Sequence, residues 1–385
     1  MSLGQAPPVA TIQFECTMIS EPPAAMLQYR RPLPLLVSLL LVGLLLYCAN
    51  NLYRRLNHHT ASSVIILTYM RSGSTFAGSL FEASPDVFYE FESLKGIYDS
   101  ESKEMKFLEV PTRLKRDYIS EVSDIIRSKL ECRLTDLDME SLTHYHLKHS
   151  RDTKRYFDCI EPHRTNATKV EIYRCLHLIQ KPCSASKVRV VKEIRLPIEA
   201  MDTILGASQS VKMIHLFRDP RAAIRSQMMY GNSPSPKVYP YAKKTCKDVL
   251  KDIKIREQLE MKYPGRIKLV FYEDLAKEPL RVTKELYAFA GLHFTAEVEE
   301  YVKSITSGKI NTSCLLCIYK SNSVYESLKW RKGINYLTAT LIDSLCGAVY
   351  KELGYLPLKS ERQLRDTTQS LRKTGNRGIL VLPKK

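Results

Sequence analysis

The feature that most restricts the fold is a series of short apolar, β-branched runs spaced along the chain. The first run, at 64–67, reads VIIL and is bounded by a loop, which is typical of a strand buried on both faces of a parallel sheet. Similar runs at 188–191, 211–217 and 267–272 predict further strands. Helical patterns separate them, at 75–83, 114–130, 220–229, 246–261 and 279–290. Strands that alternate with helices predict an α/β domain whose parallel sheet is flanked by helices.

A longer apolar run near the start predicts a membrane segment. Residues 33–49 read LPLLVSLLLVGLLLYCA and contain no charge, which fits the roughly 17–25 residues that a transmembrane helix needs. We expect a signal anchor there, with a cytosolic tail at 1–32, a stem at 50–61, a folded lumenal domain at 62–358 and a loose basic tail at 359–385. A cleaved signal peptide and a buried core helix are the alternatives.

Net charge and cysteine content indicate which partners and which cellular compartment suit the folded domain. The formal net charge of +17 favours polyanionic partners, but no basic run interleaved with aromatic residues marks a nucleic-acid groove. The cysteines after the apolar run form an even set, which permits disulfides in an oxidising compartment without revealing their pairing. Cys314 and Cys317 have the spacing of a redox or metal half-site, although no second pair accompanies them. The tripeptides at Asn166 and Asn311 are N-glycosylation acceptors if the domain is lumenal.

The loop after the first predicted strand has the chemistry of an anion site. Residues 68–76 read TYMRSGSTF and lead into a predicted helix, where free backbone N–H groups and the positive end of the helix dipole gather. Gly73 would let the backbone approach an anion, and Arg71 would supply a fixed charge with two parallel donors. The loop lacks the GxxxxGK(S/T) pattern, so the sequence does not support a nucleoside-triphosphate site with lysine and Mg²⁺. By itself the loop could also be an ordinary capped turn.

A second element follows the third predicted strand. Arg218 stands at the end of that strand, where open α/β sheets bind ligands, and Pro220 suits the first turn of the next helix. Ser226 lies two turns further on and could reach the same face as the Arg218 guanidinium. One arginine and one serine can together hold a phosphate. The alternative is that Arg218 and Asp219 only cap and pair locally.

These two elements resemble the two cofactor motifs of the sulfotransferase family. RSGSTF at 71–76 is similar to the family's 5′-phosphosulfate loop, and HLFRDPRAAIRSQ at 215–227 is similar to its 3′-phosphate motif. An arginine in the first loop resembles the Golgi carbohydrate 6-O-sulfotransferases, which act on N-acetylglucosamine, galactose and N-acetylgalactosamine. Further blocks that resemble this family lie at 84–89, 191–196, 271–276 and 285–292, so that the resemblance covers 62–356.

The resemblance implies a sulfotransferase fold and a sulfuryl transfer from 3′-phosphoadenosine 5′-phosphosulfate (PAPS) to the 6-hydroxyl group of an N-acetylhexosamine or galactose. It implies a glycan or proteoglycan acceptor, no nucleic-acid partner, no metal ion, and a single-pass type II Golgi membrane protein whose catalytic domain is lumenal. Arg71 would stabilise the leaving phosphate, and Glu92 would remove the hydroxyl proton. The residues implied in PAPS binding are Arg71, Ser72, Gly73, Ser74, Thr75, Phe76, Arg218 and Ser226.

One segment departs from the family pattern. Where the family shows YEPLWH, residues 91–96 read FESLKG, which keeps Glu92 but loses the proline, tryptophan and histidine. Glu90 is a rival for the role of base. If neither glutamate serves, the candidates are His144, His146 and His163.

Other basic residues have two interpretations. Lys192 and Arg195 could line the cleft, although on one strand they would point to different sides. The triplet at 331–333 resembles a 3′-phosphate loop of cytosolic sulfotransferases, but solvated charge in a turn is the preferred interpretation.

Two other functions stay open. The altered segment after Glu92 is compatible with a membrane-anchored glycan-binding protein that has this fold but no catalytic activity. A nucleotide-dependent kinase of the P-loop type is the other, and the missing GK(S/T) argues against it.

Overall fold

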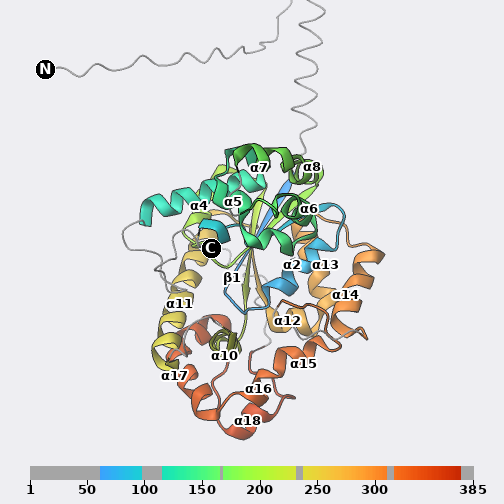
Figure 1. Ribbon diagram of the computed structural model, residues 1–385. Coiled ribbons are helices and arrows are strands. Elements are labelled where there is room, and N and C mark those ends of the chain that lie inside the picture. Colours follow the sequence, from blue (N-terminus) through green and yellow to red (C-terminus); the bar gives the residue numbers. More distant parts are fainter. Residues whose placement is uncertain (1–60, 98–114, 165–167, 231–236, 310–315, 374–385) are drawn as a thin grey trace, which may run out of the picture. The chain divides into compact units, whose positions relative to one another are not determined.

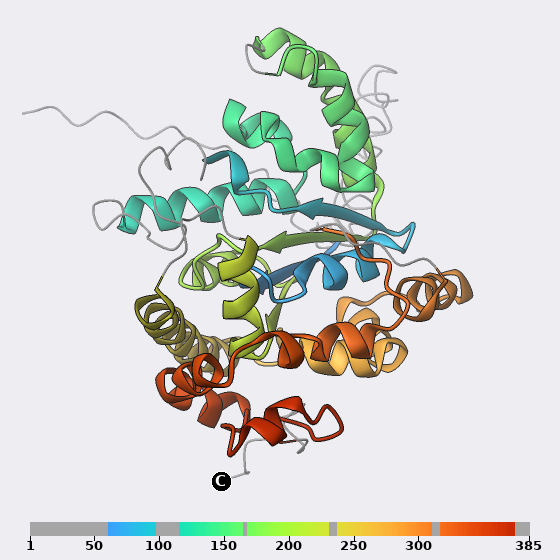
Figure 2. The ribbon, with the colours of Figure 1, turned by 60° about the horizontal axis from the view of Figure 1, so that its bottom comes forward.

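The described part of the chain, residues 61–97, 115–164, 168–230, 237–309 and 316–373, contains one parallel sheet in the computed structural model. The strands are hydrogen-bonded in the order β2-β3-β1-β4-β5 (Figure 1, Figure 2). Their bounds are β1 (Ser62–Thr68), β2 (Val87–Phe91), β3 (Val188–Glu193), β4 (Val211–Phe217) and β5 (Ile267–Phe271). Every pairing is parallel, so the predicted parallel α/β sheet is confirmed.

Helices cover both faces of this sheet and continue beyond its edges. In chain order their bounds are α2 (Ser74–Glu82), α4 (Lys115–Leu130), η1 (Leu134–Asp136), α5 (Met139–Thr143), η2 (Tyr145–His149), α6 (Arg151–Ile160), α7 (Lys169–Cys175), α8 (His177–Ala185), α9 (Ala200–Ala207), α10 (Pro220–Tyr230), α11 (Val238–Lys262), α12 (Tyr272–Lys277), α13 (Pro279–Ala290), α14 (Ala296–Ser307), α15 (Ser323–Leu328), α16 (Trp330–Gly333), α17 (Tyr336–Leu353) and α18 (Glu361–Arg365). The predicted helices match α2, α4, α10 and α13 closely. Helix α11 begins before its predicted start because Pro240 lies in its first turn, where a missing N–H costs no hydrogen bond.

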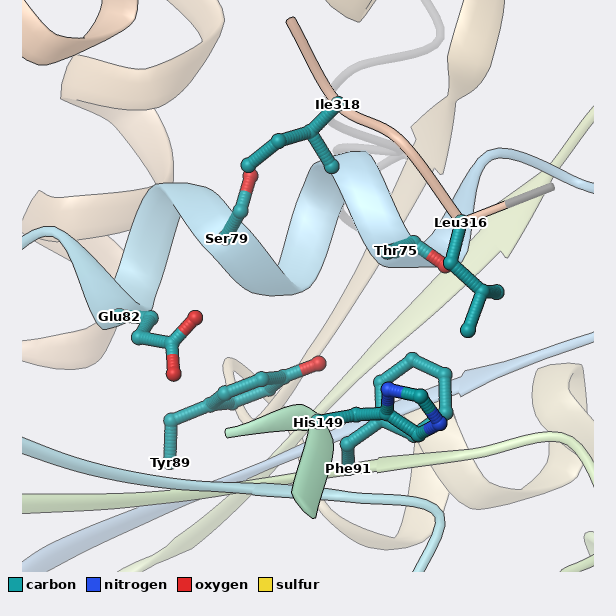
Figure 3. Close-up of a pocket in the computed structure, with 8 residues that line it drawn as sticks. All are labelled: Thr75, Ser79, Glu82, Tyr89, Phe91, His149, Leu316 and Ile318. Atoms are coloured by element: carbon teal, nitrogen blue, oxygen red, sulfur yellow. The ribbon is translucent and has the colours of Figure 1, made fainter. Parts of the chain in front are cut away.

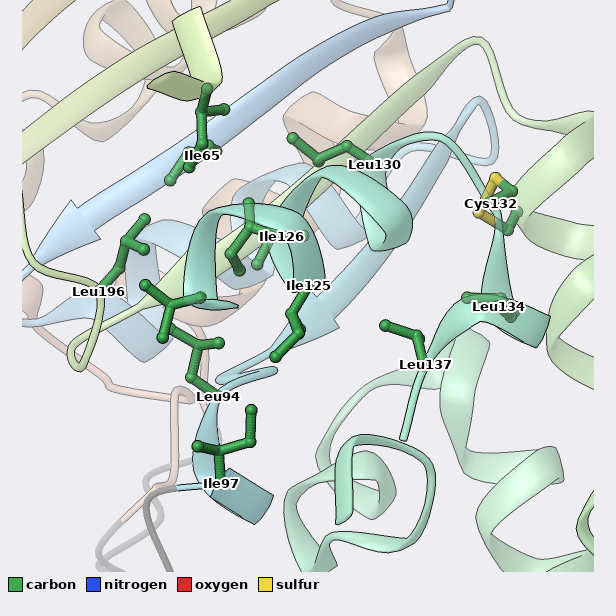
Figure 4. Close-up of a cluster of buried hydrophobic side chains, with 14 of the residues drawn as sticks. Ile65, Leu94, Ile97, Ile125, Ile126, Leu130, Cys132, Leu134, Leu137 and Leu196 are labelled. Atoms are coloured by element: carbon green, nitrogen blue, oxygen red, sulfur yellow. A yellow bond between two sulfur atoms is a disulfide. The ribbon is translucent and has the colours of Figure 1, made fainter. Parts of the chain in front are cut away.

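The alternation of side chains in β1 divides the core between the two faces of the sheet. Val64 and Ile66 pack in the cluster that includes α2 and α13, whereas Ile65 and Leu67 pack in the cluster that includes α4 and α9. Successive side chains of a strand point to opposite faces, so a run without polar residues must be covered on both. Figure 4 shows Ile65 on the side of the sheet that α4 covers.

The edge strand β2 is absent from the sequence-based prediction. Its residues, VFYEF, are all buried and pair in parallel with β3. Glu90 interrupts the apolar run, and a carboxylate is almost never fully buried unless it is paired. Lys129 Nζ of α4 lies 2.5 Å from Glu90 Oε1 and supplies that partner. The strand therefore depends on a residue far along the chain.

Disulfides tie several helices together. The paired cysteines are separated by 51, 16 and 100 positions, and cross-links of this kind stabilise a fold by roughly 2–4 kcal/mol. The pairs are Cys132–Cys183, Cys159–Cys175 and Cys246–Cys346. Cys317, considered above for a redox or metal half-site, is also disulfide-bonded.

The C-terminal segment corrects one predicted boundary. Residues 359–385 were expected to form a loose tail, but α18 and the chain up to 373 pack on the domain, with Leu364 and Leu371 buried. The Arg331 guanidinium, which is buried, donates to the backbone carbonyls of four residues there: Gln363, Leu364, Asp366 and Gln369. A buried cation needs such acceptors, and these hold the segment in place. Arg331 is therefore neither solvated nor positioned as a phosphate ligand.

Several sequence-based predictions concern residues outside the described ranges. They include the membrane run at 33–49, the tail and stem on either side of it, and both glycosylation sites, Asn166 and Asn311. Among the helices within the described ranges, none is both long and apolar enough to cross a membrane.

Candidate active site

The site begins at the turn between β1 and α2. Arg71 and Gly73 both have left-handed backbone conformations, with φ of 65° and 84°. The Ser72 N–H donates to the Tyr69 carbonyl at 3.2 Å, which closes the turn. Within the described residues no side chain caps the start of α2. The N–H groups and the positive dipole end of α2 are thus presented at the carboxyl edge of the sheet, as an anion site requires.

Gly73 is required by its own surroundings. A Cβ atom built on it would lie 2.1 Å from Cδ2 of the Tyr272 ring, and its positive φ also disfavours other residues. From the sequence, Gly73 was expected to let an anion approach the backbone. In the structure, the group that lies close to Gly73 is the Tyr272 ring. Phe76, the last residue of the predicted motif, meets the same ring edge-on at 6.4 Å between centroids.

The two predicted motifs meet in space. Arg71 Nε donates to Ser226 Oγ at 3.0 Å, and Arg218 Nη1 donates to the Arg71 carbonyl at 2.9 Å. The amide of Gln227 donates to the Met70 carbonyl at 2.5 Å. Helix α10 therefore holds the turn by side-chain hydrogen bonds, and Ser226 reaches the first motif as the helical spacing indicated.

The Arg218 guanidinium has the features of a group that could bind an anion. Its guanidinium carbon lies 4.6 Å from the centre of the Tyr272 ring, which fixes the side chain by a cation–π contact. Its Nε is buried and has no hydrogen-bond partner among the described residues. Buried donors are nearly always paired, so this N–H is suited to a ligand acceptor.

Asp219 and Arg221 support the site from behind. The Asp219 carboxylate accepts from Arg221 Nη2 at 2.7 Å, and the Asp219 N–H donates to Glu273 Oε1 at 2.9 Å. The local pairing considered as an alternative for this motif therefore applies to Asp219, while Arg218 points to the turn.

Glu92 is enclosed by donors. Its φ is 52°, and its side chain is buried where β2 ends. Lys192 Nζ lies 2.5 Å from Oε1, His146 Nδ1 lies 3.0 Å from Oε2, and Arg195 Nη1 donates to Oε2 as well. Burial would raise the pKa of Glu92, but Lys192, His146 and Arg195 outweigh burial and hold that pKa well below its ordinary value. Such a carboxylate is a weak proton acceptor.

This cluster corrects the prediction for Lys192 and Arg195. They were expected to point to different sides of a strand, yet both reach Glu92. The reason is that β3 ends at Glu193, so Arg195 lies beyond the strand and is not bound by its alternation.

The other candidate bases lie elsewhere. Glu90 faces α4, where Lys129 and His144 surround it. Burial raises the pKa of Glu90, but the charge of Lys129 and the contact with His144 outweigh burial and lower that pKa to about 2. Burial lowers the pKa of His144 to about 4. His163 is exposed near Glu171, at 3.6 Å between Nδ1 and Oε1.

A cavity of about 130 Å³ opens beside α2 (Figure 3). Its walls are α2, β2, the end of η2 and the segment that follows residue 315. The lining residues are Thr75, Ser79, Glu82, Tyr89, Phe91, His149, Leu316 and Ile318. Only Thr75 was among the residues predicted for the site. Ser79 and Glu82 lie on α2 beyond the loop motif, Tyr89 and Phe91 lie on the unpredicted strand β2, and His149, Leu316 and Ile318 lie in segments without a recognised motif. The available signals were the family-like block at 84–89, which contains Tyr89, and the histidines at 144–149.

Metal ligation has no candidate in the described ranges, where no group of three His, Cys, Asp or Glu side chains is arranged to hold an ion.

Comparison with known proteins agrees with this geometry. The family described as "Sulfotransferase domain" matches residues 61–309. Human carbohydrate sulfotransferase 5 is 27% identical over 80% of this chain and 81% of its own. Mouse carbohydrate sulfotransferase 4 is 26% identical over 78% and 83%, and Danio rerio carbohydrate sulfotransferase 1 is 25% identical over 84% and 85%.

Solved structures give weaker likenesses. The sulfotransferase domain of a Synechococcus olefin synthase is 17% identical, with a TM-score of 0.37 over 81% of this chain and 96% of that one. A mouse sulfotransferase complexed with PAP is 12% identical, with a TM-score of 0.40 over 79% and 88%. At such TM-scores these likenesses add nothing to the family match. That match covers more than half of the chain and both motifs, so the chain belongs to the sulfotransferase family of enzymes, and the resemblance to carbohydrate sulfotransferases is confirmed.

Proposed function

We propose that the enzyme transfers a sulfuryl group from PAPS to a carbohydrate hydroxyl group. The observation that carries this proposal is the junction of the two motifs, where Arg71, Ser226 and Arg218 meet at the start of α2. Membership of the sulfotransferase family and the names of the curated relatives support the reaction class and the acceptor class.

Residues on both sides of the junction fit the donor. Arg71, Phe76 and the backbone N–H groups of 72–75 would bind the 5′-phosphosulfate, and Arg218 with Ser226 would bind the 3′-phosphate. The specific feature that favours an anion here is the buried Nε of Arg218, which has no hydrogen-bond partner in the part of the chain that the structure describes. Bound PAPS supplies the activated sulfuryl group, and Arg71 would stabilise the negative charge that develops on the leaving phosphate.

The proposed acceptor is the 6-hydroxyl group of an N-acetylhexosamine or a galactose. The net charge of +17 suits an anionic glycan or proteoglycan chain. Glu92 contributes by holding Lys192, Arg195 and His146 in one cluster beside the cavity. With its pKa held low, we assign it this positioning role in preference to direct proton removal.

The proposed setting is the Golgi lumen, with the run at 33–49 as a type II membrane anchor. The disulfides support an oxidising compartment. Treatment with peptide-N-glycosidase tests the orientation: a membrane-inserted preparation should gain gel mobility, and an unchanged mobility would count against lumenal use of Asn166 and Asn311.

Transfer of labelled sulfate from PAPS to a panel of glycans tests the function. The panel contains glycosides that end in N-acetylglucosamine, N-acetylgalactosamine or galactose, and the position of the label is determined in each product. Label on the 6-oxygen is expected. Glycan binding without transfer would favour an inactive glycan-binding protein, and failure to bind 3′-phosphoadenosine 5′-phosphate (PAP) would contradict the donor site.

A further inference from the structure

We propose that the cavity beside α2 binds the acceptor sugar and that His149 takes the proton from the hydroxyl group that is sulfated. This inference rests on the proposed function and adds two assignments to it: the acceptor subsite and the proton acceptor. It concerns the residues of Figure 3, of which Thr75 alone belongs to either of the two cofactor motifs.

The cavity lies next to the proposed donor site. Thr75, in the first turn of α2, both belongs to the phosphosulfate loop and lines the cavity. His149 lines it from the end of η2, on the side of β2 that faces α2 (Figure 3). A hydroxyl group held in this cavity would therefore stand between a sulfuryl group at the start of α2 and the His149 ring.

The size and chemistry of the walls suit one sugar ring. Pockets for drug-sized ligands begin at roughly 300 Å³, whereas this cavity measures about 130 Å³. Phe91 and Tyr89 offer apolar ring surface, and Ser79, Thr75 and Glu82 offer hydrogen-bonding groups. An apolar wall with a few polar groups is the usual arrangement of a small-molecule site.

Tyr89 provides a second, independent sign of a ligand. Its side chain is 2% exposed, and its hydroxyl group has no hydrogen-bond partner among the described residues. In Figure 3 the hydroxyl lies beneath α2 on the side of His149. Burial keeps the pKa of Tyr89 well above its ordinary value, so the group stays protonated and can donate to a sugar oxygen.

The rival bases are worse placed. Both oxygens of Glu92 are engaged by cations, and Glu90 faces α4 on the other side of the sheet. His146 is held by Glu92 and does not line the cavity. Among the described residues, the His149 ring makes aromatic contacts, with centroid distances of 5.4 Å to Phe91, 5.5 Å to His146 and 6.0 Å to Tyr145.

The protonation state of His149 fits this role. Burial, and then His146 and Lys148, lower its pKa to about 4, so the ring is neutral at neutral pH and can accept a proton. The titratable and charged groups that face it from the surrounding elements are Tyr145, His146, Lys148, Glu82, Tyr89, Glu92 and Lys192. Of these, Glu92 raises the pKa of His149 and Lys192 lowers it.

The step balances with the residues named. The acceptor oxygen forms a bond to sulfur while the bond between sulfur and the phosphate oxygen breaks, and its electron pair leaves with PAP. The hydroxyl proton passes to the imidazole of His149, which becomes imidazolium and then releases the proton to solvent. Arg71 would stabilise the negative charge that develops on the leaving phosphate.

Substitution of His149 tests the assignment. In His149→Ala and His149→Gln, kcat/KM for transfer from PAPS to benzyl glycosides of N-acetylglucosamine and galactose should fall by roughly 10²–10⁴-fold. PAP affinity, measured by calorimetry, should stay within about twofold, and added imidazole should restore part of the rate of His149→Ala. His163→Ala, which changes an exposed histidine, is the matched control and should keep full activity. Tyr89→Phe should raise the acceptor KM more than it lowers kcat.

The pH profile separates the base from its neighbours. The wild-type kcat/KM should fall below an apparent pKa of about 4, and this acid limb should be lost from the residual activity of His149→Gln. Full transfer by either His149 variant, or a loss of PAP affinity equal to the loss of rate, would overturn the inference. If the wild-type chain binds PAP but transfers nothing, the proposed function fails and this inference with it; if the wild type transfers and the variants do too, only this inference fails.

Discussion

The proposed donor site and the neighbouring acceptor side, which is the cluster around Glu92, are stabilised by different kinds of interaction. On the donor side, the turn at 71–73 and the helix α10 are joined by hydrogen bonds to backbone carbonyls and to one hydroxyl group. On the acceptor side, Glu92 is buried with Lys192 of β3 and with Arg195. We therefore expect substitutions on the donor side to change ligand affinity more than stability, and the loss of a buried charge on the acceptor side to lower stability.

The largest expected effect comes from breaking the acceptor-side cluster. Glu92→Gln removes the carboxylate charge that contacts the buried Lys192 and Arg195, which should lower the free energy of unfolding by about 3–5 kcal/mol. Transfer should fall by roughly 10²–10⁴-fold as well, because His146, whose ring packs against that of His149, loses its contact with the Glu92 carboxylate. Chemical denaturation followed by fluorescence measures the first effect and labelled sulfate transfer the second.

The control for this variant is Glu131→Gln, which removes an exposed ion pair with Arg133. Exposed pairs contribute roughly 0–1 kcal/mol. Equal stability of the two variants would contradict the contrast between the two sides.

The next effect concerns the donor side, where ligand affinity should change and stability should not. Arg71→Ala and Arg218→Ala each remove a charged phosphate contact, which should cost roughly 1.5–3 kcal/mol of PAPS or PAP binding, about tenfold to a hundredfold. Calorimetric titration with PAP measures this loss, and Arg133→Ala, at an exposed position, serves as the comparison. Unchanged affinity in both variants would remove the basis for the donor site.

A pH titration of stability sharpens the contrast further. In the unfolded chain a histidine takes up its proton near pH 6.5, while burial lowers the pKa of His144 in the folded chain to about 4. Between these values the unfolded state binds more protons, so stability should fall as the pH drops from about 6.5 to about 4, by up to about 1.4 kcal/mol per pH unit. His144→Gln should make this slope shallower, leaving the contribution of His149, and His163→Gln should not change it; equal slopes in all three proteins would exclude His144 as a source.

The smallest effect is expected at Ser226. Ser226→Ala removes the acceptor of the Arg71 Nε hydrogen bond, which should cost about 0.5–1.5 kcal/mol of PAP affinity, at most about tenfold. Thermal stability should be unchanged. A loss as large as that of Arg71→Ala would mean that the hydroxyl group is itself a principal phosphate contact and not a support for Arg71.

Elements with a local pattern were predictable from the sequence. A pattern of a few neighbouring residues is enough to predict the strands β1, β3, β4 and β5 and the small-residue turn before α2. Strand β2 and the packed segment at 361–373 were not predictable in this way. These two segments contain the charged residue Glu90 or pack on the charged residue Arg331. Both charges can be buried only because partners from other segments of the chain form hydrogen bonds or ion pairs with them.

The sequence by itself therefore determined the family, the parallel sheet and the position of the two motifs at strand ends, because these depend on strand and helix periods and on turns of a few residues. Only the tertiary structure decided how Glu92, Lys192 and Arg195 converge, and that His149 lines the same cavity as Thr75. The physical reason is that the charge state and the accessibility of a side chain depend on its neighbours in space. Those neighbours come from β2, β3, η2 and α2, which no spacing along the chain brings together.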